Sequence, residues 1–210
     1  FKQKTAYEIG VRLVGSEMCI RDRSHVVPFD HPEIDNWRNS LHRGLMHRYK
    51  DTGIILTGGV DDIWQDTITR QLIIVDYKSQ AKNGRVDKKD YLEDPFHEAY
   101  KIQMDFYAYL LSGMGFSVHP ISYFLVCNAK RDEDEFNKTM RFDEYLVPYK
   151  WRNDWIESRL DEMVTLMNQS EIPESNPSCK NCAYADQYSK ILFSRNSSKK
   201  EITQGTLPLF

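Results

Sequence analysis

The chain has 210 residues, of which 40% are hydrophobic, and its formal net charge is −3. This length supports one main domain with a small appendage and excludes two full domains. No apolar stretch reaches the roughly 18 to 20 residues that cross a bilayer, and the acidic balance does not indicate a broadly basic nucleic-acid-binding surface. We therefore expect a soluble intracellular protein whose function has to be inferred from particular residues.

The first residues differ in character from the rest of the chain. The segment Leu13–Arg23 resembles a translated sequencing adapter that recurs in unrelated environmental sequences. We therefore expect residues 1–23 to be a non-native leader, with an ordinary amphipathic leader as the alternative. We expect the native sequence to start near Ser24 and Cys19 to have no chemical role.

Two strands are expected in the first half of the chain, after a segment, His31–Tyr49, that gives no firm prediction. The segment Gly53–Trp64 is β-branched and apolar, and its central Gly58–Gly59 pair predicts a strand that is bent or bulged there. After a polar turn, Gln71–Lys78 is apolar enough to form a strand buried on both faces. These two segments are expected to be neighbouring core strands.

A helix and two further strands follow a charged loop over residues 79–94. In His97–Leu111, apolar residues recur at helical spacing, namely Ile102, Phe106, Tyr109 and Leu110. Strands are predicted over Phe116–Cys127 and Thr139–Val147. The amphipathic pattern of Trp151–Met167 then predicts a helix that packs on the sheet. The order of elements indicates one α/β domain over residues 24–170, with helices flanking a mixed central sheet.

Three charged residues occur where the two central strands end. Asp76 and Lys78 are two apart on one strand, so their side chains point to the same face. A hairpin-like return would bring the carboxylate of Asp61 close to that of Asp76. Two carboxylates supply the hard oxygen ligands that Mg²⁺ prefers, and a nearby ammonium can orient water and stabilise charge on a phosphoryl oxygen. Taken alone, D-x-K more often ends a strand with solvated charges.

The context of these residues carries a family resemblance. Gly58–Asp61, Ile73–Ser79 and Gln103–Tyr107 resemble the three successive motifs of RecB-like nucleases of the PD-(D/E)XK superfamily. The likeness covers residues 54–128, and its third motif, Q-x-x-x-Y, is the most discriminating. It implies a restriction-endonuclease-like fold and hydrolysis of phosphodiester bonds with Mg²⁺ or Mn²⁺.

The resemblance also implies roles for single residues. Asp61, Asp76 and the backbone carbonyl of Tyr77 would bind metal, and Lys78 would be the catalytic cation. Gln103 and Tyr107 would support the site from one helix face, although a packing role is the alternative for both.

Other polar residues near these motifs are given lesser roles. Asp62 is expected on the opposite face from Asp61, and Asp66 in a turn, both solvated. Many RecB-like enzymes place a histidine ahead of the first acid, and His42 and His47 are the nearby candidates. Neither histidine lies in a convincing copy of that motif.

The end of the chain changes in composition. We expect a cysteine-containing knot over residues 171–193, where Cys179 and Cys182 have the spacing to share one Zn²⁺ ion or one iron of an iron–sulfur cluster. Two ligands are not four, so an incomplete site is the alternative. Cys127 lies in a predicted buried strand, where a free cysteine acts as a small hydrophobe.

Residues 194–210 are expected to form a mobile tail. Its end, Gln204–Phe210, resembles the short peptides with which bacterial and phage proteins dock on a sliding clamp, and packing on its own core is the alternative.

The function expected from these observations is a metal-dependent deoxyribonuclease. The resemblance favours an exonuclease acting on single- or double-stranded DNA in replication, repair or recombination, in bacterial or phage-infected cytoplasm. Arg131, Arg141, Lys150 and Arg152 are candidates for phosphate contacts. The main alternative is a catalytically silent nucleic-acid-binding or scaffold protein of the same fold docked to a sliding clamp. A hydrolase of small phosphoesters is the third.

Overall fold

The computed structural model describes residues 25–131, 141–171 and 173–202. The chain divides into two units, residues 1–158 and 159–210, and the candidate site lies wholly within the first. Among the described residues, no helix has the length and apolar character required to cross a membrane.

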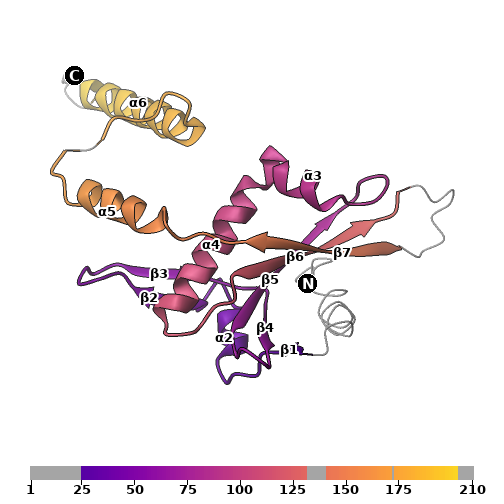
Figure 1. The fold of residues 1–210 in the computed structure, drawn as a ribbon. Helices are drawn as coiled ribbons and strands as arrows, with labels where there is room; N and C mark the ends of the chain where they lie inside the picture. The colour runs from indigo at the N-terminus through magenta and orange to yellow at the C-terminus, as the bar shows by residue number, and fades with distance from the viewer. Residues whose placement is uncertain (1–24, 132–140, 172, 203–210) are drawn as a thin grey trace, which may run out of the picture. The chain divides into compact units, whose positions relative to one another are not determined.

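Figure 1 shows the helices and strands of the chain, with the strands β2 to β5 following one another before the longer helices begin. In chain order they are β1 (Val26–Pro28), α2 (Ile34–Trp37), β2 (Leu45–Arg48), β3 (Ile55–Gly58), β4 (Asp62–Asp66), β5 (Leu72–Gln80), α3 (Lys88–Glu93), the 3₁₀ helix η1 (Pro95–His97), α4 (Glu98–Gly113), β6 (Ile121–Ala129), β7 (Phe142–Lys150), α5 (Ile156–Met167) and α6 (Lys180–Ile202).

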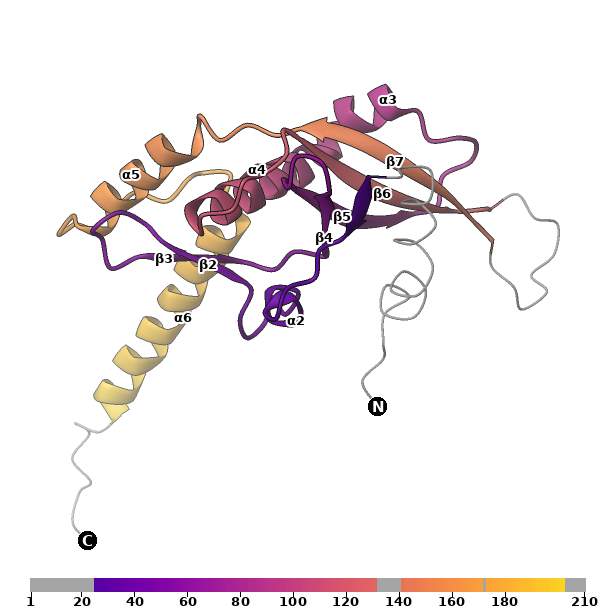
Figure 2. The ribbon, with the colours of Figure 1, turned by 60° about the horizontal axis from the view of Figure 1, so that its bottom comes forward.

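The main sheet has five strands in the order β1-β4-β5-β6-β7. β5 pairs in parallel with β6, whereas the other pairs are antiparallel, so the sheet is mixed as expected. A parallel pair needs a long crossover, and here α3, η1 and α4 supply it. The helix α4 contacts β5 as well as the small β2–β3 ribbon, and Figure 2 shows it lying along the ribbon.

The hydrophobic core explains why β5 is the central strand. Its residues from Leu72 to Asp76 are all buried, which fits a strand covered on both faces. One face packs into a cluster of Val26, Trp64, Ile73, Val75 and Leu125. The helix α4, with buried residues that include Met104 and Leu111, contacts the strand on its other face. A strand held on both sides fixes where its last residues point.

The structure corrects several boundaries. Gly53–Trp64 is not one bent strand, because β3 and β4 belong to different sheets and the Gly58–Gly59 pair lies where the chain passes between them. The charged loop contains the short helix α3, whose N-cap is Asp87. In α4 the buried face differs in part from the predicted one, since Ile102 is exposed and Tyr107 is buried.

The second unit also differs from expectation. α6 runs from Lys180 to Ile202, so a helix replaces the expected knot and the first part of the expected tail. An α-helix is stabilised by backbone hydrogen bonds between residues four apart, so this segment needs no cross-link between the two cysteines. Residues 203–210, with the docking-like peptide Gln204–Phe210, lie outside the described residues, as does the leader at 1–23.

Candidate active site

The β4–β5 hairpin brings the two predicted acids together. Asp62 pairs with Val75 in the antiparallel register, which places Asp61 beside Asp76, midway along β5. Asp61 Oδ2 accepts a hydrogen bond of 2.8 Å from the backbone N–H of Tyr77. The charge and hydrogen bonding of Asp61 also reach the carboxyl group of Asp76. The expected convergence of the two carboxyl groups is therefore present in the structure.

Asp76 is a buried acid without enough positive charge around it. Its side chain is 1% exposed, and burial raises its pKa to about 7, against the lowering effect of Lys78 and with a further raising effect from Asp61. Its Oδ2 has an ion pair with Lys78 but no well-formed hydrogen bond among the described residues. Two adjacent carboxylates facing one ammonium leave an excess of negative charge that favours a bound cation.

Lys78 is held in place on three sides. Its Nζ lies 2.5 Å from Asp76 Oδ2 and donates to Gln103 Oε1 at 3.2 Å. The same ammonium lies 4.4 Å from the centroid of the Tyr100 ring, which provides a cation–π contact. With a side chain only 17% exposed, Lys78 is a positioned cation rather than a solvated one.

The helix α4 supports this arrangement with the two residues of the third motif. Gln103 Nε2 donates to Tyr107 Oη at 2.5 Å, so the pair four apart share one helix face as predicted. Burial raises the pKa of Tyr107 to about 12, which keeps its hydroxyl protonated. A Cβ at Gly58 would lie 3.0 Å from the Tyr107 ring, so the glycine allows β3 to approach that side chain.

Asp62 was expected to be solvated, and this expectation is wrong. It is buried and accepts four hydrogen bonds, from Arg38, Tyr77, the indole of Trp64 and the N–H of Ile63. Burial, together with the charge and hydrogen bond of Asp62, raises the pKa of Tyr77 well above its usual range. The clue in the sequence was the pair of aromatic donors on β4 and β5 that share this face.

Asp66 is likewise buried rather than solvated. Its Oδ1 accepts from the backbone N–H groups of Ile68 and Thr69, which closes the β4–β5 turn, and these bonds hold its pKa below the usual value. The two candidate histidines have other surroundings. His42 is exposed, and His47 on β2 packs edge-on against Tyr109.

Asp105 was not singled out in the sequence, yet it organises one end of the first unit. The buried carboxylate accepts from Tyr149 Oη, from the N–H of Arg152 and from Trp155 Nε1, each at 2.9 Å. It joins α4 to the chain that follows β7. The only signal in the sequence was an acid among the apolar residues of a predicted helix, and that signal is weak.

The residues present fit a hard divalent cation. Among the described residues no three His, Cys, Asp or Glu side chains converge, so protein ligands would be Asp61 and Asp76, with the predicted carbonyl of Tyr77. Mg²⁺ commonly takes one or two carboxylates and fills its remaining positions with water and substrate phosphate. The surplus negative charge at Asp76 supplies the electrostatic reason for a cation there.

The cysteine pair lies at the start of α6. Cys179 Sγ accepts from the N–H of Cys182 at 3.2 Å, and the pKa of Cys179 is lowered by the hydrogen bond from the Cys182 thiol. Cys127 is buried in β6, where burial raises the pKa of its thiol to about 11. Within the parts of the chain that the structure describes, no third ligand joins the pair, so metal binding there stays a prediction.

The family model of the PD-(D/E)XK nuclease superfamily matches residues 1–187. No curated protein and no solved structure gave a match. The matched region includes both strands and the helix that carry the candidate site, and the mixed sheet agrees with the superfamily's fold. Its members are metal-dependent phosphodiester hydrolases. The chain belongs to the PD-(D/E)XK nuclease superfamily.

Proposed function

We propose that this protein is a deoxyribonuclease that hydrolyses DNA phosphodiester bonds with Mg²⁺ or Mn²⁺, acting as an exonuclease in replication, repair or recombination. The observation that carries the proposal is the ion pair between Asp76 and Lys78 in the second half of β5, with the carboxylate of Asp61 beside it. Family membership supplies the reaction class, and this geometry supplies the residues.

Asp61 and Asp76 would hold the cation. When bound, it would polarise a phosphoryl oxygen and lower the pKa of a coordinated water. The chain prepares for it by fixing Asp61 through the N–H of Tyr77 and by burying Asp76 among core side chains. Both carboxylates are thus positioned by β4 and β5 before any substrate arrives, which limits the reorganisation needed during the reaction.

Lys78 would act on the scissile phosphate. Its ammonium has three N–H donors, and in the structure two of them face Asp76 and Gln103 while Tyr100 covers one side. A phosphoryl oxygen that gains charge during attack by water would be stabilised by this fixed positive group. The lysine can also orient the attacking water by donating to it.

Gln103, Tyr107 and Tyr100 are positioning residues. Gln103 accepts from Lys78 and donates to Tyr107, so helix α4 restrains the ammonium through a continuous hydrogen-bonded chain. Rigid support of this kind matters because a small displacement of a catalytic group can lower the rate by orders of magnitude. A packing role was the alternative for Gln103 and Tyr107. It is compatible with the supporting role described here.

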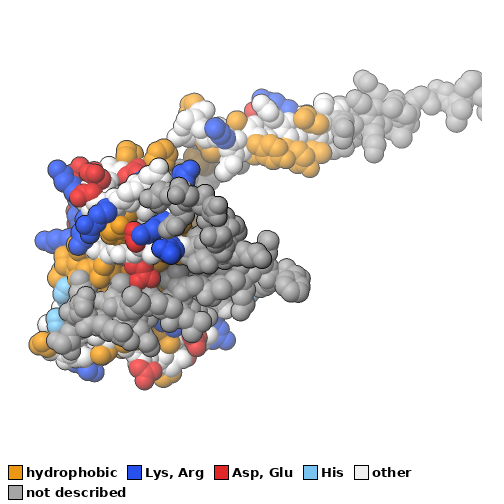
Figure 3. Space-filling model, turned by 90° about the vertical axis from the view of Figure 1, so that its right-hand side faces the viewer, with side chains coloured by type: hydrophobic (Ala, Val, Ile, Leu, Met, Phe, Trp, Pro, Cys, Tyr) orange, Lys and Arg blue, Asp and Glu red, His pale blue; other side chains and the backbone are white. Residues whose placement is uncertain are grey.

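The choice of DNA and of exonuclease action rests on the RecB-like resemblance of the three motifs. Charged side chains of both signs are interspersed on the described part of the face in Figure 3, with no large basic patch. Arg131, Lys150 and Arg152 are exposed and stay candidates for phosphate contacts. DNA binding would then depend on a few local contacts near the candidate site, with a modest dependence on salt.

The test is incubation of labelled single- and double-stranded DNA with Mg²⁺ or Mn²⁺. We expect cleavage by the wild-type protein and a loss of about 10²- to 10³-fold in Lys78→Ala. Lys89→Ala, which removes an exposed lysine on α3, is the matched control and should cleave normally. Equal rates in the wild type and Lys78→Ala would contradict the proposal.

The same assay addresses the alternatives. A silent scaffold protein would bind DNA without cleaving it under any metal condition, and a small-phosphoester hydrolase would prefer a nitrophenyl phosphodiester to DNA. Docking on a sliding clamp through Gln204–Phe210 stays a prediction from the sequence, because those residues are outside the described part of the chain.

A further inference from the structure

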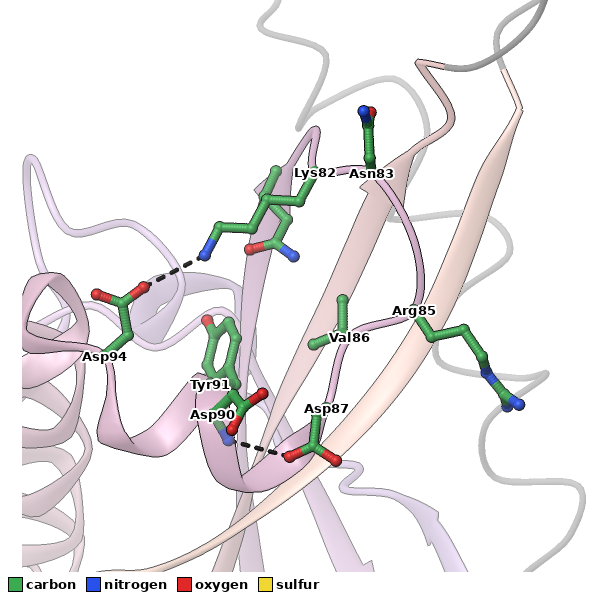
Figure 4. Close-up of a pocket in the computed structure, with 9 residues that line it drawn as sticks. Lys82, Asn83, Arg85, Val86, Asp87, Asp90, Tyr91 and Asp94 are labelled. Carbon is green, nitrogen blue, oxygen red and sulfur yellow. Dashed lines mark hydrogen bonds and ion pairs between the residues drawn. The ribbon is translucent and has the colours of Figure 1, made fainter.

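A cavity of about 230 Å³ lies beside the candidate active site. It is bounded by the end of β5, the loop over residues 81–86 and helix α3, as Figure 4 shows. Gln80 lines it and follows Lys78 by two residues, so both side chains point to the same face of β5. The cavity therefore continues the face of the strand that carries Asp76 and Lys78.

A row of aromatic rings joins the cavity to the candidate catalytic lysine. Tyr91, in the cavity wall, packs on His97 with ring centroids 4.1 Å apart, and His97 stacks on Tyr100 at 5.2 Å. Tyr100 in turn lies against the Lys78 ammonium. A ligand that orders Tyr91 would be coupled through rigid ring contacts to the position of Lys78.

The hydroxyl of Tyr91 is the polar group that points to a ligand. The residue is only 4% exposed, and its Oη has no hydrogen-bond partner among the described residues. In Figure 4 the hydroxyl points toward the end of the cavity that carries Lys82. A buried hydroxyl without a partner costs about 1 to 3 kcal/mol, so an acceptor from a bound molecule would relieve a penalty already present in the protein.

The charges of the cavity argue against a phosphate as that ligand. Three carboxylates, Asp87, Asp90 and Asp94, line it against the two cations Lys82 and Arg85. Lys82 is already paired with Asp94 at 3.2 Å, and Figure 4 shows Arg85 directed away from Tyr91. An anion would meet a net negative wall, whereas a neutral group with both donors and acceptors would find complements for each.

The size of the cavity narrows the choice to a small planar group. Its volume falls below the roughly 300 to 1,000 Å³ of pockets for drug-sized ligands. A nucleobase offers both donors and acceptors on its edges, and amide and carboxylate side chains such as Gln80 and Asp90 are common partners for them. Gln80 follows Lys78 by two residues on the same strand face, so a base in this cavity would belong to a nucleotide near the bond on which Lys78 would act.

We propose that this cavity binds the unpaired base of a nucleotide adjacent to the scissile phosphodiester, with the Tyr91 hydroxyl donating to it. The proposal rests on the proposed nuclease function and adds a substrate requirement to it. The base must leave its duplex partner to enter the cavity, as in enzymes that extrude a nucleotide. The protein would therefore cut single strands or frayed ends faster than intact duplex.

The test combines Tyr91→Phe with abasic substrates in single-turnover cleavage. In the wild type, an abasic residue moved stepwise along a labelled single strand should slow cleavage about 3- to 10-fold at one position relative to the cut, the value of one hydrogen bond. Tyr91→Phe should cleave the intact strand at that reduced rate and lose the sensitivity. Tyr123→Phe, on the opposite face of the sheet, should keep it.

A binding measurement separates this proposal from the proposed function. With Ca²⁺ in place of Mg²⁺, anisotropy should show a preference for oligothymidylate over an abasic strand of equal length, and Tyr91→Phe should reduce it. If this base preference depends on Tyr91 but no cleavage is seen, the base site is retained and the nuclease function is overturned. If DNA is cleaved but neither assay shows a base preference that depends on Tyr91, the base site alone is overturned. If neither cleavage nor base preference is seen, both proposals are overturned. Sensitivity to a terminal phosphate alone, lost in Tyr91→Phe, would also overturn the base assignment.

Discussion

Two buried aspartates on neighbouring strands have opposite surroundings. Asp62 on β4 is 3% exposed and accepts four hydrogen bonds, including one from the guanidinium of Arg38. Asp76 on β5 is 1% exposed and has one ammonium, that of Lys78, with a second carboxylate beside it. Both acids are buried, and the number of compensating donors distinguishes the structural role of Asp62 from the surroundings of Asp76.

The largest effect expected from this contrast is on stability. Asp62→Ala would leave Arg38 and the Tyr77 hydroxyl without their acceptor, so we expect a loss of about 3 kcal/mol in the free energy of unfolding. Asp35→Ala is the matched control, because Asp35 is an exposed partner of the same guanidinium, and it should cost less than about 0.5 kcal/mol. Denaturant unfolding of both variants measures the difference, and similar losses would contradict the assignment of Asp62.

The support of Lys78 predicts the next effect, on activity. Gln103→Leu removes the acceptor of Lys78 Nζ and the donor to Tyr107, while keeping a similar volume in α4. We expect kcat to fall about 10- to 100-fold, the range for one hydrogen bond to a charged group. Ile102→Ala, at the exposed neighbouring position, should stay within about twofold of wild type. A normal kcat in Gln103→Leu would make Gln103 a packing residue.

The glycines before Asp61 give a smaller effect on stability. A Cβ at Gly59 would lie 2.3 Å from Ser40 Cβ and 2.7 Å from its Cα, so a backbone segment would have to move. We expect Gly59→Ala to lower the free energy of unfolding by about 1 to 3 kcal/mol. Gly53→Ala meets nothing within 4 Å and serves as the control. Equal stability of the two variants would show that the approach to Ser40 is not constrained.

The raised pKa of Asp76, about 7, predicts an effect on stability that depends on pH. In EDTA the unfolded chain ionises this group near pH 4 and the folded protein only near pH 7. Stability is therefore full below pH 4 and is lost as the pH rises toward 7. Asp76→Asn should lack this part of the pH dependence, and Mg²⁺ should reverse it in the wild type. Parallel pH profiles of the two proteins would contradict the pKa assignment.

Much of the fold followed from the sequence because apolar runs mark buried strands directly. β5 and its D-x-K motif were predictable, since the buried run Leu72–Val75 is apolar and alternation places Asp76 and Lys78 on one face, although the strand continues past the predicted end at Lys78 to Gln80. The split of Gly53–Trp64 between two sheets was not, because pairing partners far along the chain decide it. Helix α6 was missed because its polar residues carry no hydrophobic period.

The candidate site shows the same division. Asp61, Asp76, Lys78 and the Gln103–Tyr107 pair could be found from motif spacing, which encodes strand alternation and one helical turn. The network around Asp62 could not, because its donors come from α2, β4 and β5 and meet only in the folded chain. Tyr91 was missed for a related reason, since an unpartnered buried hydroxyl is a property of packing.

The most direct test of the central claim is Mn²⁺ binding followed by electron paramagnetic resonance. The wild type and Lys78→Ala should bind the ion, because both keep the carboxylates, whereas Asp61→Asn and Asp76→Asn should bind it at least about tenfold more weakly. Asp51→Asn, at an exposed position, should bind it normally. Unchanged Mn²⁺ affinity in both Asp61→Asn and Asp76→Asn would show that these two acids do not form the metal site.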